Sequence, residues 1–292
     1  MLRQHSLCDF STSESWVILS PIEQSIKRKI EAVGTPLKDW DINIYRGVLT
    51  GCNEAFIITT EKRNEILANC QTEEERARTS NIIRPIIRGR DIKRYGYEWA
   101  DLWLIATFPS RHYDIEEYPA VKTYLLSFGI ERLEQTGKKY VINGEEVKAR
   151  KKTNNKWFET QDSINYWQDF LKPKIIWKRV GSILRFGYND NGALGLDSTC
   201  FATGKQIEYL CCVLNSPMGH YLLKDSPKTG TGDLLISVQA VEPIKVPLIN
   251  EEENSKFKNL FKTYQENEIN REVYELYNLS EEEIKFIMDN YY

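Results

Sequence analysis

Two groups of basic side chains in this sequence have the chemistry needed to bind a polyanion. Residues 84–94 hold five basic residues and one acidic residue, and residues 148–156 hold five more basic residues. Arginine can pair with guanine O6 and N7 in the major groove of DNA, whereas contacts to phosphates give sequence-independent affinity. A solvated charged loop is the alternative for both groups. The candidate contact residues are Arg84, Arg88, Arg90, Lys93, Arg94, Lys151, Lys152 and Lys156.

A glycine turn carries small polar groups that can also face a ligand. Gly47 and Gly51 bracket Thr50, and Asn53 follows shortly before an apolar run, Phe56 to Ile58. Glycine permits unusual backbone angles and the close approach of a partner, while threonine and asparagine supply hydrogen-bonding groups without bulk. Thr50 and Asn53 therefore either contact DNA or only stabilise their own turn.

Further candidates lie in the second half of the chain. The loop from Lys228 to Asp233 lacks the Gly-Lys-Ser/Thr ending of a nucleotide-binding loop, but its backbone N–H groups can hold a DNA phosphate. An ordinary hairpin loop is the alternative. Tryptophans interleaved with lysines suggest base stacking, although core packing is favoured for most of them. These stretches add Lys174, Lys178, Lys228, Thr229 and Thr231 to the candidate DNA contacts.

The charge of the chain is unevenly distributed. The whole sequence of 292 residues has a net charge of −3. Residues 251–292 contain 11 acidic and 5 basic side chains, so the preceding 250 residues are net positive. The attraction of a polyanion is determined by local patches of charge and not by the net charge of the whole chain. A DNA-binding role is therefore compatible with this composition.

Composition narrows the class of protein. The hydrophobic content of 41% and charged content of 28% are those of a folded globular protein. We see neither an apolar run of membrane-spanning length nor a signal peptide, so we expect a cytoplasmic protein. The six cysteines lack Cys-x-x-Cys spacing and are expected to be reduced and buried. The sequence suggests neither a metal site nor a catalytic triad or carboxylate pair.

The elements that must position these groups form a mixed pattern. Ser20, Pro21 and Glu23 form a capping box before a helix that should end at Gly34, and Thr72 should cap another. We expect an α+β fold with a twisted, mostly antiparallel sheet, flanking helices and a helical tail. A recognition domain would span residues 1–250 and the tail 251–292. Other expected helices are 116–133, 205–215 and 217–224, and expected strands are 40–44, 56–59, 102–107, 175–178, 183–188 and 198–202, with a loop or exposed hairpin over 138–155.

Several blocks, in order, resemble the C-terminal specificity domain of TaqI-like adenine-N6 DNA methyltransferases and of fused type IIG restriction–modification enzymes. The stretch from Tyr209 to Ser216, with the following glycine loop and Pro243 to Pro247, is also similar to type I specificity subunits. The block Val273 to Ile284 resembles the C-terminal end of the fused enzymes. No single block is decisive, but their order is fairly specific. The blocks are Gly34 to Leu37, Trp40 to Ile42, the glycine turn, Ile86 to Tyr95 with its Arg-Gly-x-Asp-Ile core, Trp157 to Glu159, Pro173 to Trp177, Tyr209 to Ser216, Pro243 to Pro247 and Val273 to Ile284.

The resemblance stops short of the catalytic part. The family's catalytic part carries an Asn/Asp-Pro-Pro-Tyr motif and a Phe-x-Gly-x-Gly cofactor turn, and this sequence has neither. We also find no convincing Pro-Asp…Glu-x-Lys nuclease core. The resemblance therefore implies a non-catalytic DNA target-recognition domain whose partners are double-stranded DNA and a methyltransferase domain, possibly with a nuclease. S-adenosylmethionine would bind to that other domain, and the target adenine would be flipped out of the duplex.

Two other classes of function stay open. The chain is either a nuclease or methyltransferase fragment with an activity of its own, or a protein-interaction module whose basic loops are incidental. Metal-dependent DNA cleavage by the purified chain would support the first alternative. The second alternative predicts no salt-dependent DNA binding.

Overall fold

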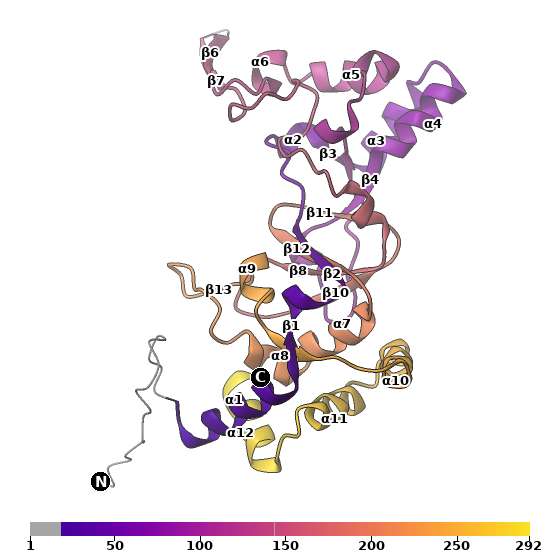
Figure 1. The fold of residues 1–292 in the computed structure, drawn as a ribbon. Coiled ribbons are helices and arrows are strands. Elements are labelled where there is room, and N and C mark those ends of the chain that lie inside the picture. Colours follow the sequence, from indigo (N-terminus) through magenta and orange to yellow (C-terminus); the bar gives the residue numbers. More distant parts are fainter. Residues whose placement is uncertain (1–18, 143) are drawn as a thin grey trace. The chain divides into compact units, whose positions relative to one another are not determined.

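The chain forms two compact units, which are described separately. The computed structural model describes residues 19–142 and 144–292, and Figure 1 shows their helices and strands. The first unit comprises the described residues up to Ile42 together with Glu208–Tyr292, and the second comprises Asn43–Ile207. Cys8 and His5 lie outside the described residues. None of the described helices combines the length and the apolar character that crossing a membrane would require.

The first unit is mainly helical. Its strands β1 (Gly34–Pro36) and β14 (Lys245–Pro247) pair antiparallel, and β13 (Leu234–Leu235) follows a hairpin turn. Its helices, of which α7 starts one residue before the unit boundary, are α1 (Pro21–Val33), α7 (Ile207–Asn215), α8 (Pro217–Leu222), α9 (Val238–Val241), α10 (Glu251–Lys262), α11 (Glu266–Leu276) and α12 (Glu281–Tyr291).

Local signals set the ends of helix α1, as predicted. The Ser20 side chain accepts from the backbone N–H of Glu23, and the Glu23 carboxylate accepts from the backbone N–H of Ser20. Gly34 ends the helix in an extended conformation, not in the left-handed one. A Cβ atom at Gly34 would lie 2.7 Å from Cβ of Lys245 and 2.8 Å from the Ile30 carbonyl oxygen. Glycine is therefore required here by the close approach of β14.

The acidic tail folds as three helices within the first unit. Ser280 forms the predicted capping box with Glu283, and that carboxylate also pairs with Lys29 of α1 at 2.6 Å. The Tyr277 hydroxyl donates to the Lys245 carbonyl at 2.9 Å, and α12 packs on α8 and α1. The two compact units are thus not separated at residue 250. The division into a recognition domain and a tail at that residue stays a prediction about function.

The second unit contains most of the strands. Its helices are α2 (Asn53–Phe56), α3 (Thr60–Ala68), α4 (Glu73–Ile82), α5 (Pro119–Leu126) and α6 (Ile130–Leu133). Its strands, of which β2 starts one residue before the unit, are β2 (Ile42–Arg46), β3 (Ile57–Thr59), β4 (Ile83–Ile87), β5 (Leu102–Ile105), β6 (Lys139–Ile142), β7 (Glu145–Lys148), β8 (Lys174–Lys178), β9 (Val180–Gly181), β10 (Phe186–Asn189), β11 (Leu194–Gly195) and β12 (Thr199–Gly204).

Two four-stranded sheets organise this unit. One has the strand order β10-β8-β12-β2 and the other the order β11-β4-β5-β3. The β10-β8, β12-β8, β4-β5 and β3-β5 pairs are antiparallel, whereas β11 runs parallel to β4. The mostly antiparallel sheets with flanking helices confirm the predicted α+β class. Strand β8 lies between β10 and β12, so these three strands do not follow one another as a simple meander.

Aromatic side chains pack together in the core of the second unit. The rings of Tyr45 and Tyr166 stack with centroids 4.3 Å apart, and those of Phe170 and Phe201 are also 4.3 Å apart. Phe170 and Phe201 are fully buried. The Tyr166 hydroxyl donates to the Arg46 carbonyl at 2.9 Å, so its polar end is satisfied as well.

Three predictions about elements need correction. The helix expected over residues 116–133 is interrupted at Gly129, whose φ of 84° excludes it from a right-handed helix. The strand expected from Ile183 begins only at Phe186, because Ile183 points into solvent instead of pairing. Helix α3 was not predicted, because its apolar residues show almost no helical periodicity.

Candidate nucleic-acid interface

Four of the candidate residues line one groove in the second unit. The groove has a volume of about 480 Å³, and Ile57, Leu102 and Leu196 give it an apolar lining. Among the described residues, no carboxylate lies within ion-pair distance of Arg90 or Lys178, and both of these side chains are exposed. The polar and charged lining of the groove consists of Asn53, Glu54, Arg88, Arg90, Lys178 and Ser198.

Arg88 is held in place by a neighbouring carboxylate. Its Nε and Nη2 groups each donate to Asp91 at 2.8 Å, and its backbone N–H donates to the same carboxylate at 3.0 Å. Burial opposes ionisation of Asp91, but the bonds from Arg88 outweigh it and lower the pKa of that carboxyl. The same contact raises the pKa of Arg88. The guanidinium is therefore charged and oriented, and its Nη1 group makes no bond among the described residues.

The glycine turn packs against the backbone that forms one wall of this groove. The Gly47 N–H donates to the Thr199 carbonyl at 3.0 Å, and the Val48 N–H donates to the Gly195 carbonyl at 2.8 Å. A Cβ atom on Gly47 would lie 2.1 Å from the Leu196 carbonyl oxygen, and Gly51 has a φ of 76°. Both predicted reasons for glycine are therefore confirmed, one at each position.

Within this turn, Thr50 and Asn53 have different surroundings. Thr50 is completely buried, donates to the Asn53 side chain at 2.6 Å and accepts from the Cys52 N–H at 3.1 Å. Thr50 is therefore removed from the candidate DNA contacts, because it stabilises the turn and no part of it reaches the surface. Asn53 is exposed and remains a candidate for base recognition.

The other basic residues of the segment 84–94 do not line the groove. Arg84 on β4 donates to the Gly192 carbonyl at 3.3 Å. Lys93 pairs with Glu98 at 3.1 Å, and the Arg94 guanidinium lies 5.8 Å from the centre of the Tyr95 ring. The sequence cluster is thus divided by the fold, and Arg88 and Arg90 are the two members that share the groove.

In the second cluster, one arginine holds the loop together. Arg150 is only 4% exposed and donates to the carbonyls of Leu133, Thr50, Glu159 and Trp157 at 2.6–2.9 Å. Burial lowers its pKa to about 10, which still leaves it charged at neutral pH. Because Arg150 satisfies four carbonyls, it anchors the segment that carries the exposed side chains Lys151, Lys152 and Lys156.

Lys174 must be withdrawn as a DNA contact. Its side chain is 0% exposed, and its ammonium group donates to the Asn189 side chain at 2.6 Å and to the Phe170 carbonyl at 2.7 Å. Burial, with the nearby Arg84 charge, lowers the pKa of Lys174 to about 7. The strand β8 therefore presents its two lysines differently, with Lys174 in the core and Lys178 in the groove.

The predicted phosphate-binding loop is a small hairpin in the first unit. The Thr229 and Thr231 hydroxyls are 2.8 Å apart, and Thr231 donates to the Asp233 carboxylate at 3.1 Å. The Thr229 N–H donates to the Asp233 carbonyl at 2.8 Å. These bonds favour the hairpin interpretation, while Lys228 and Thr231 stay exposed.

The tryptophans have mainly structural roles, as favoured above. Trp177 is buried, and Trp157 and Trp167 pack against the hydrophobic core. The Arg111 guanidinium lies 3.9 Å from the centre of the Trp167 ring. Trp157 and Trp167 are half-buried, and Trp177 does not reach the surface.

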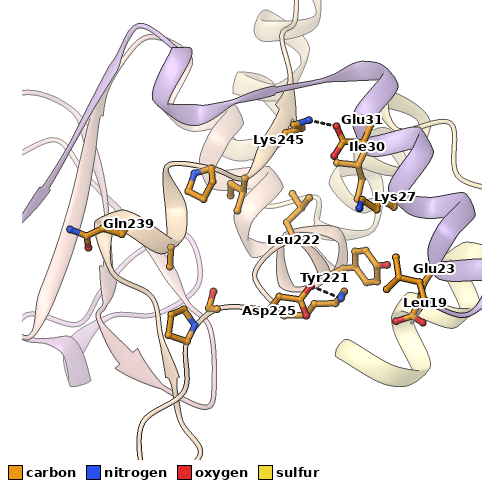
Figure 2. Close-up of a pocket in the computed structure, with 16 residues that line it drawn as sticks. Leu19, Glu23, Lys27, Ile30, Glu31, Tyr221, Leu222, Asp225, Gln239 and Lys245 are labelled. Carbon is orange, nitrogen blue, oxygen red and sulfur yellow. Dashed lines mark hydrogen bonds and ion pairs between the residues drawn. The ribbon is translucent and has the colours of Figure 1, made fainter. Parts of the chain in front are cut away.

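A second cavity, also of about 480 Å³, lies wholly within the first unit (Figure 2). Tyr221, Leu222 and Ile244 give it an apolar lining. Its rim combines both signs of charge, because Lys245 pairs with Glu31 and Lys224 pairs with Asp225. Unlike the groove in the second unit, this cavity is lined by three basic and three acidic side chains, so its lining has no net charge to attract a polyanion.

Sequence reasoning missed three features of the interface. Leu196 and Ser198 reach the groove only through the pairing of residues 195–199 with the glycine turn, which no local pattern announces. The anchoring role of Arg150 depends on four carbonyls, and that of Thr50 lies 100 residues away in sequence. The exposed basic loop between β8 and β10 was assigned in part to a strand.

The residues that match a known family include most of those that line the groove. Residues 84–238, just over half of the chain, match the family described as the TaqI-like C-terminal specificity domain. The chain belongs to this family. Arg88, Arg90, Lys178 and Ser198 of the groove all lie within the matched residues of the specificity domain.

One solved structure shows a similar fold at low sequence identity, and a second one is less similar. The type IIL restriction–modification enzyme MmeI, solved in complex with DNA, is 10% identical, with a TM-score of 0.54 over 89% of this chain. The type IIG restriction endonuclease BpuSI is 9% identical, with a TM-score of 0.45 over 82% of this chain. The specificity domain spans 36% and 27% of the lengths of those two chains. No curated protein sequence matches it significantly.

Proposed function

We propose that this specificity domain recognises a short sequence in double-stranded DNA on behalf of a restriction–modification enzyme. The observation that carries the proposal is the groove in which Arg90 and Lys178, next to an oriented Arg88, have no carboxylate partner in the part of the chain that the structure describes. A groove with unpaired cations attracts phosphates, and an oriented guanidinium matches the edge of guanine. Membership of a specificity-domain family supports the same conclusion.

The exposed side chains divide into two roles under this proposal. Arg90, Lys178 and the loop residues Lys151, Lys152 and Lys156 would contact phosphates and position the duplex. Arg88 and Asn53 would contact base edges, because both are polar, both line the groove and both are held by a neighbouring side chain. Base contacts of this kind are worth about 1–3 kcal/mol of discrimination for each bidentate pair.

The chemistry of the parent enzyme would reside elsewhere. We propose that a methyltransferase domain outside these 292 residues binds S-adenosylmethionine and methylates an adenine that the specificity domain presents. The amino group of adenine is not reachable inside the base stack, so the base would have to be flipped out. Any DNA cleavage would also come from a domain beyond this chain.

A selection experiment tests the proposal. Purified chain is incubated with random duplex DNA, the retained fraction is sequenced, and the enriched duplex is then measured by fluorescence anisotropy. We expect enrichment of a motif of a few base pairs that contains adenine. Arg88→Gln should weaken binding to that motif more than to random duplex, because it removes a base contact.

Two results would contradict the proposal. One is the absence of any enriched motif, both with the chain alone and with a methyltransferase domain fused to it. The other is an equal loss of affinity for the motif and for random DNA in Arg88→Gln. Lys258→Ala serves as the matched control, because Lys258 is an exposed basic residue on α10 without an ion pair among the described residues.

A further inference from the structure

The loop 178–185, which joins strands β8 and β10 and contains the short strand β9, begins at the groove. Lys178 at its start lines the groove, and the Arg179 N–H donates to the carbonyl of Ser198, another groove residue, at 2.9 Å. Residues 178–185 contain three basic side chains, Lys178, Arg179 and Arg185, and no acidic one. A duplex held in the groove would therefore meet a second, contiguous patch of positive charge in this loop.

An aliphatic side chain projects from this basic loop. Ile183 is 66% exposed, whereas the next residue, Leu184, is buried and fixes the loop to the unit. A single exposed apolar residue is common on protein surfaces and carries no meaning alone. Its place between Arg179 and Arg185, on a loop joined to the groove, distinguishes it from other exposed side chains.

Aliphatic side chains on basic elements have a specific use on DNA. Residues such as isoleucine, leucine and phenylalanine can insert between adjacent base pairs and partly unstack them, while nearby cations hold the phosphates. A branched aliphatic side chain has the size for such insertion, and its transfer from water into the base stack is favourable. The neighbouring Arg179 and Arg185 would supply the phosphate contacts.

A second hairpin of the same unit gives an internal comparison. Val141, on strand β6 of the β6–β7 hairpin, is 79% exposed and is also aliphatic. Its hairpin, residues 139–148, carries two basic and two acidic side chains, and Lys139 pairs with Glu146 at 2.8 Å. Exposure of an aliphatic residue is therefore similar in the two loops, and only the Ile183 loop has a one-sided charge.

We propose that Ile183 is an apolar wedge that enters a base-pair step of the bound duplex and unstacks it. The inference rests on the proposed function and makes it more specific, because it assigns the loop 178–185 to distortion of the DNA. Unstacking one step lowers the cost of extruding a neighbouring base. The wedge would thus act before any chemistry on the DNA.

Fluorescence of 2-aminopurine tests the wedge, because it rises when this base loses its stacking partners. Duplexes that contain the selected motif carry 2-aminopurine at successive positions, and anisotropy confirms binding in each case. We expect a rise at one step with the native chain. Ile183→Ala should abolish most of this rise and weaken binding about tenfold. Ile183→Phe should keep the rise, and Val141→Ala should behave as the native chain does.

Different outcomes would overturn different statements. If the chain binds the duplex but the 2-aminopurine signal is the same in the native protein and in Ile183→Ala, the wedge is wrong and the recognition role stands. An equal loss of signal in Val141→Ala would also overturn the wedge. If anisotropy detects no binding to any duplex, both with the chain alone and with a methyltransferase domain fused to it, the proposed function fails, and the wedge fails with it.

Discussion

The two compact units differ in net charge. The unit Asn43–Ile207 contains 26 basic and 21 acidic side chains, a net charge of +5, and the other unit contains 13 basic and 21 acidic side chains, a net charge of −8. In the acidic unit many cations are paired, as in Lys29–Glu283, Lys256–Glu272 and Lys285–Asp289. The basic unit also contains ion pairs, such as Arg46–Asp197 and Lys122–Glu116, but Arg90 and Lys178, which have no ion pair among the described residues, lie together in one groove.

Because of this difference, the net charge of the whole chain does not predict whether the chain binds a polyanion. A total of −3 hides a unit with an excess of positive charge and a groove that gathers part of it. Within the basic unit, the cations also divide into buried ones and exposed ones, which have different roles. Arg150 and Lys174 are buried and support the fold, whereas Lys151, Lys152 and Lys178 are exposed and are free to meet phosphates.

The largest expected effect comes from the buried arginine. Arg150→Leu leaves the carbonyls of Leu133, Thr50 and Trp157 without their side-chain donor, whereas the Glu159 carbonyl keeps its bond from the Gln135 amide. Since each unsatisfied buried group costs about 1–3 kcal/mol, we expect a loss of unfolding free energy on the order of 4 kcal/mol. Urea denaturation measures it. A loss below about 1 kcal/mol would mean that Arg150 belongs with the surface cations.

Lys174 should give the unit a distinctive pH dependence. Its pKa is about 7 in the folded protein and 10.5 for an ordinary lysine. Between these values the unfolded chain binds the proton and the folded chain does not, so this group makes stability rise with pH from about 7 to about 10. The contribution is at most about 1.4 kcal/mol per pH unit.

Denaturation of native chain and Lys174→Met at pH 7 and pH 9 isolates this contribution. We expect the native protein to gain stability relative to the variant as the pH rises. The absolute stability of the variant is not the test, since the Asn189 amide oxygen and the Phe170 carbonyl lose a donor. Parallel pH profiles would contradict the assignment of Lys174 as a buried amine.

A smaller effect is expected from the paired cations of the acidic unit. Lys29 pairs with Glu283, a largely buried carboxylate, and also donates to the Asn278 carbonyl at 2.6 Å. Lys29→Ala should therefore cost about 1–2 kcal/mol of stability without changing DNA affinity. Lys285→Ala, which removes an exposed pair with Asp289, should cost less than about 0.5 kcal/mol. Equal costs would show that burial does not distinguish the two pairs.

The smallest effect on stability should come from the exposed loop lysines. Replacing Lys151 and Lys152 by alanine should change the unfolding free energy by no more than about 0.5 kcal/mol, because both side chains are exposed. Affinity for duplex DNA should nevertheless fall several-fold at low salt. If the Lys151/Lys152 double variant loses stability but keeps its affinity for DNA, these lysines support the fold, as Arg150 does, and do not contact phosphates.

Local features of the structure could be predicted from the sequence, and non-local ones could not. Ser20, Thr72 and Ser280 each cap a helix as predicted, because a cap depends only on residues three positions away. The burial of Lys174 depends on Phe170 and on Asn189 from the neighbouring strand. The position of β8 between β10 and β12 is likewise set by long-range pairing.

The same limit applies to the candidate site. The basic segment 84–94 and the glycine turn were recognised as stretches of sequence, and the fold brings Asn53, Arg88, Arg90 and Lys178 into one groove. The sequence could not separate these residues from Arg84 or Lys93, which have the same charge. That separation depends on the Gly192 carbonyl and Glu98, whose positions follow from the folded backbone.

The most direct test of the central claim is the salt dependence of duplex binding. Affinity is measured over a salt series for the native chain, for the double variant Arg90→Ala/Lys178→Ala, and for Lys258→Ala/Lys262→Ala in the acidic unit. The plot of log K against log salt has a negative slope, and each lost phosphate contact reduces the magnitude of this slope by about 0.9. We predict a slope reduced by about 2 for the groove variant and an unchanged slope for the control. Equal slopes in all three proteins would contradict recognition of DNA through this groove.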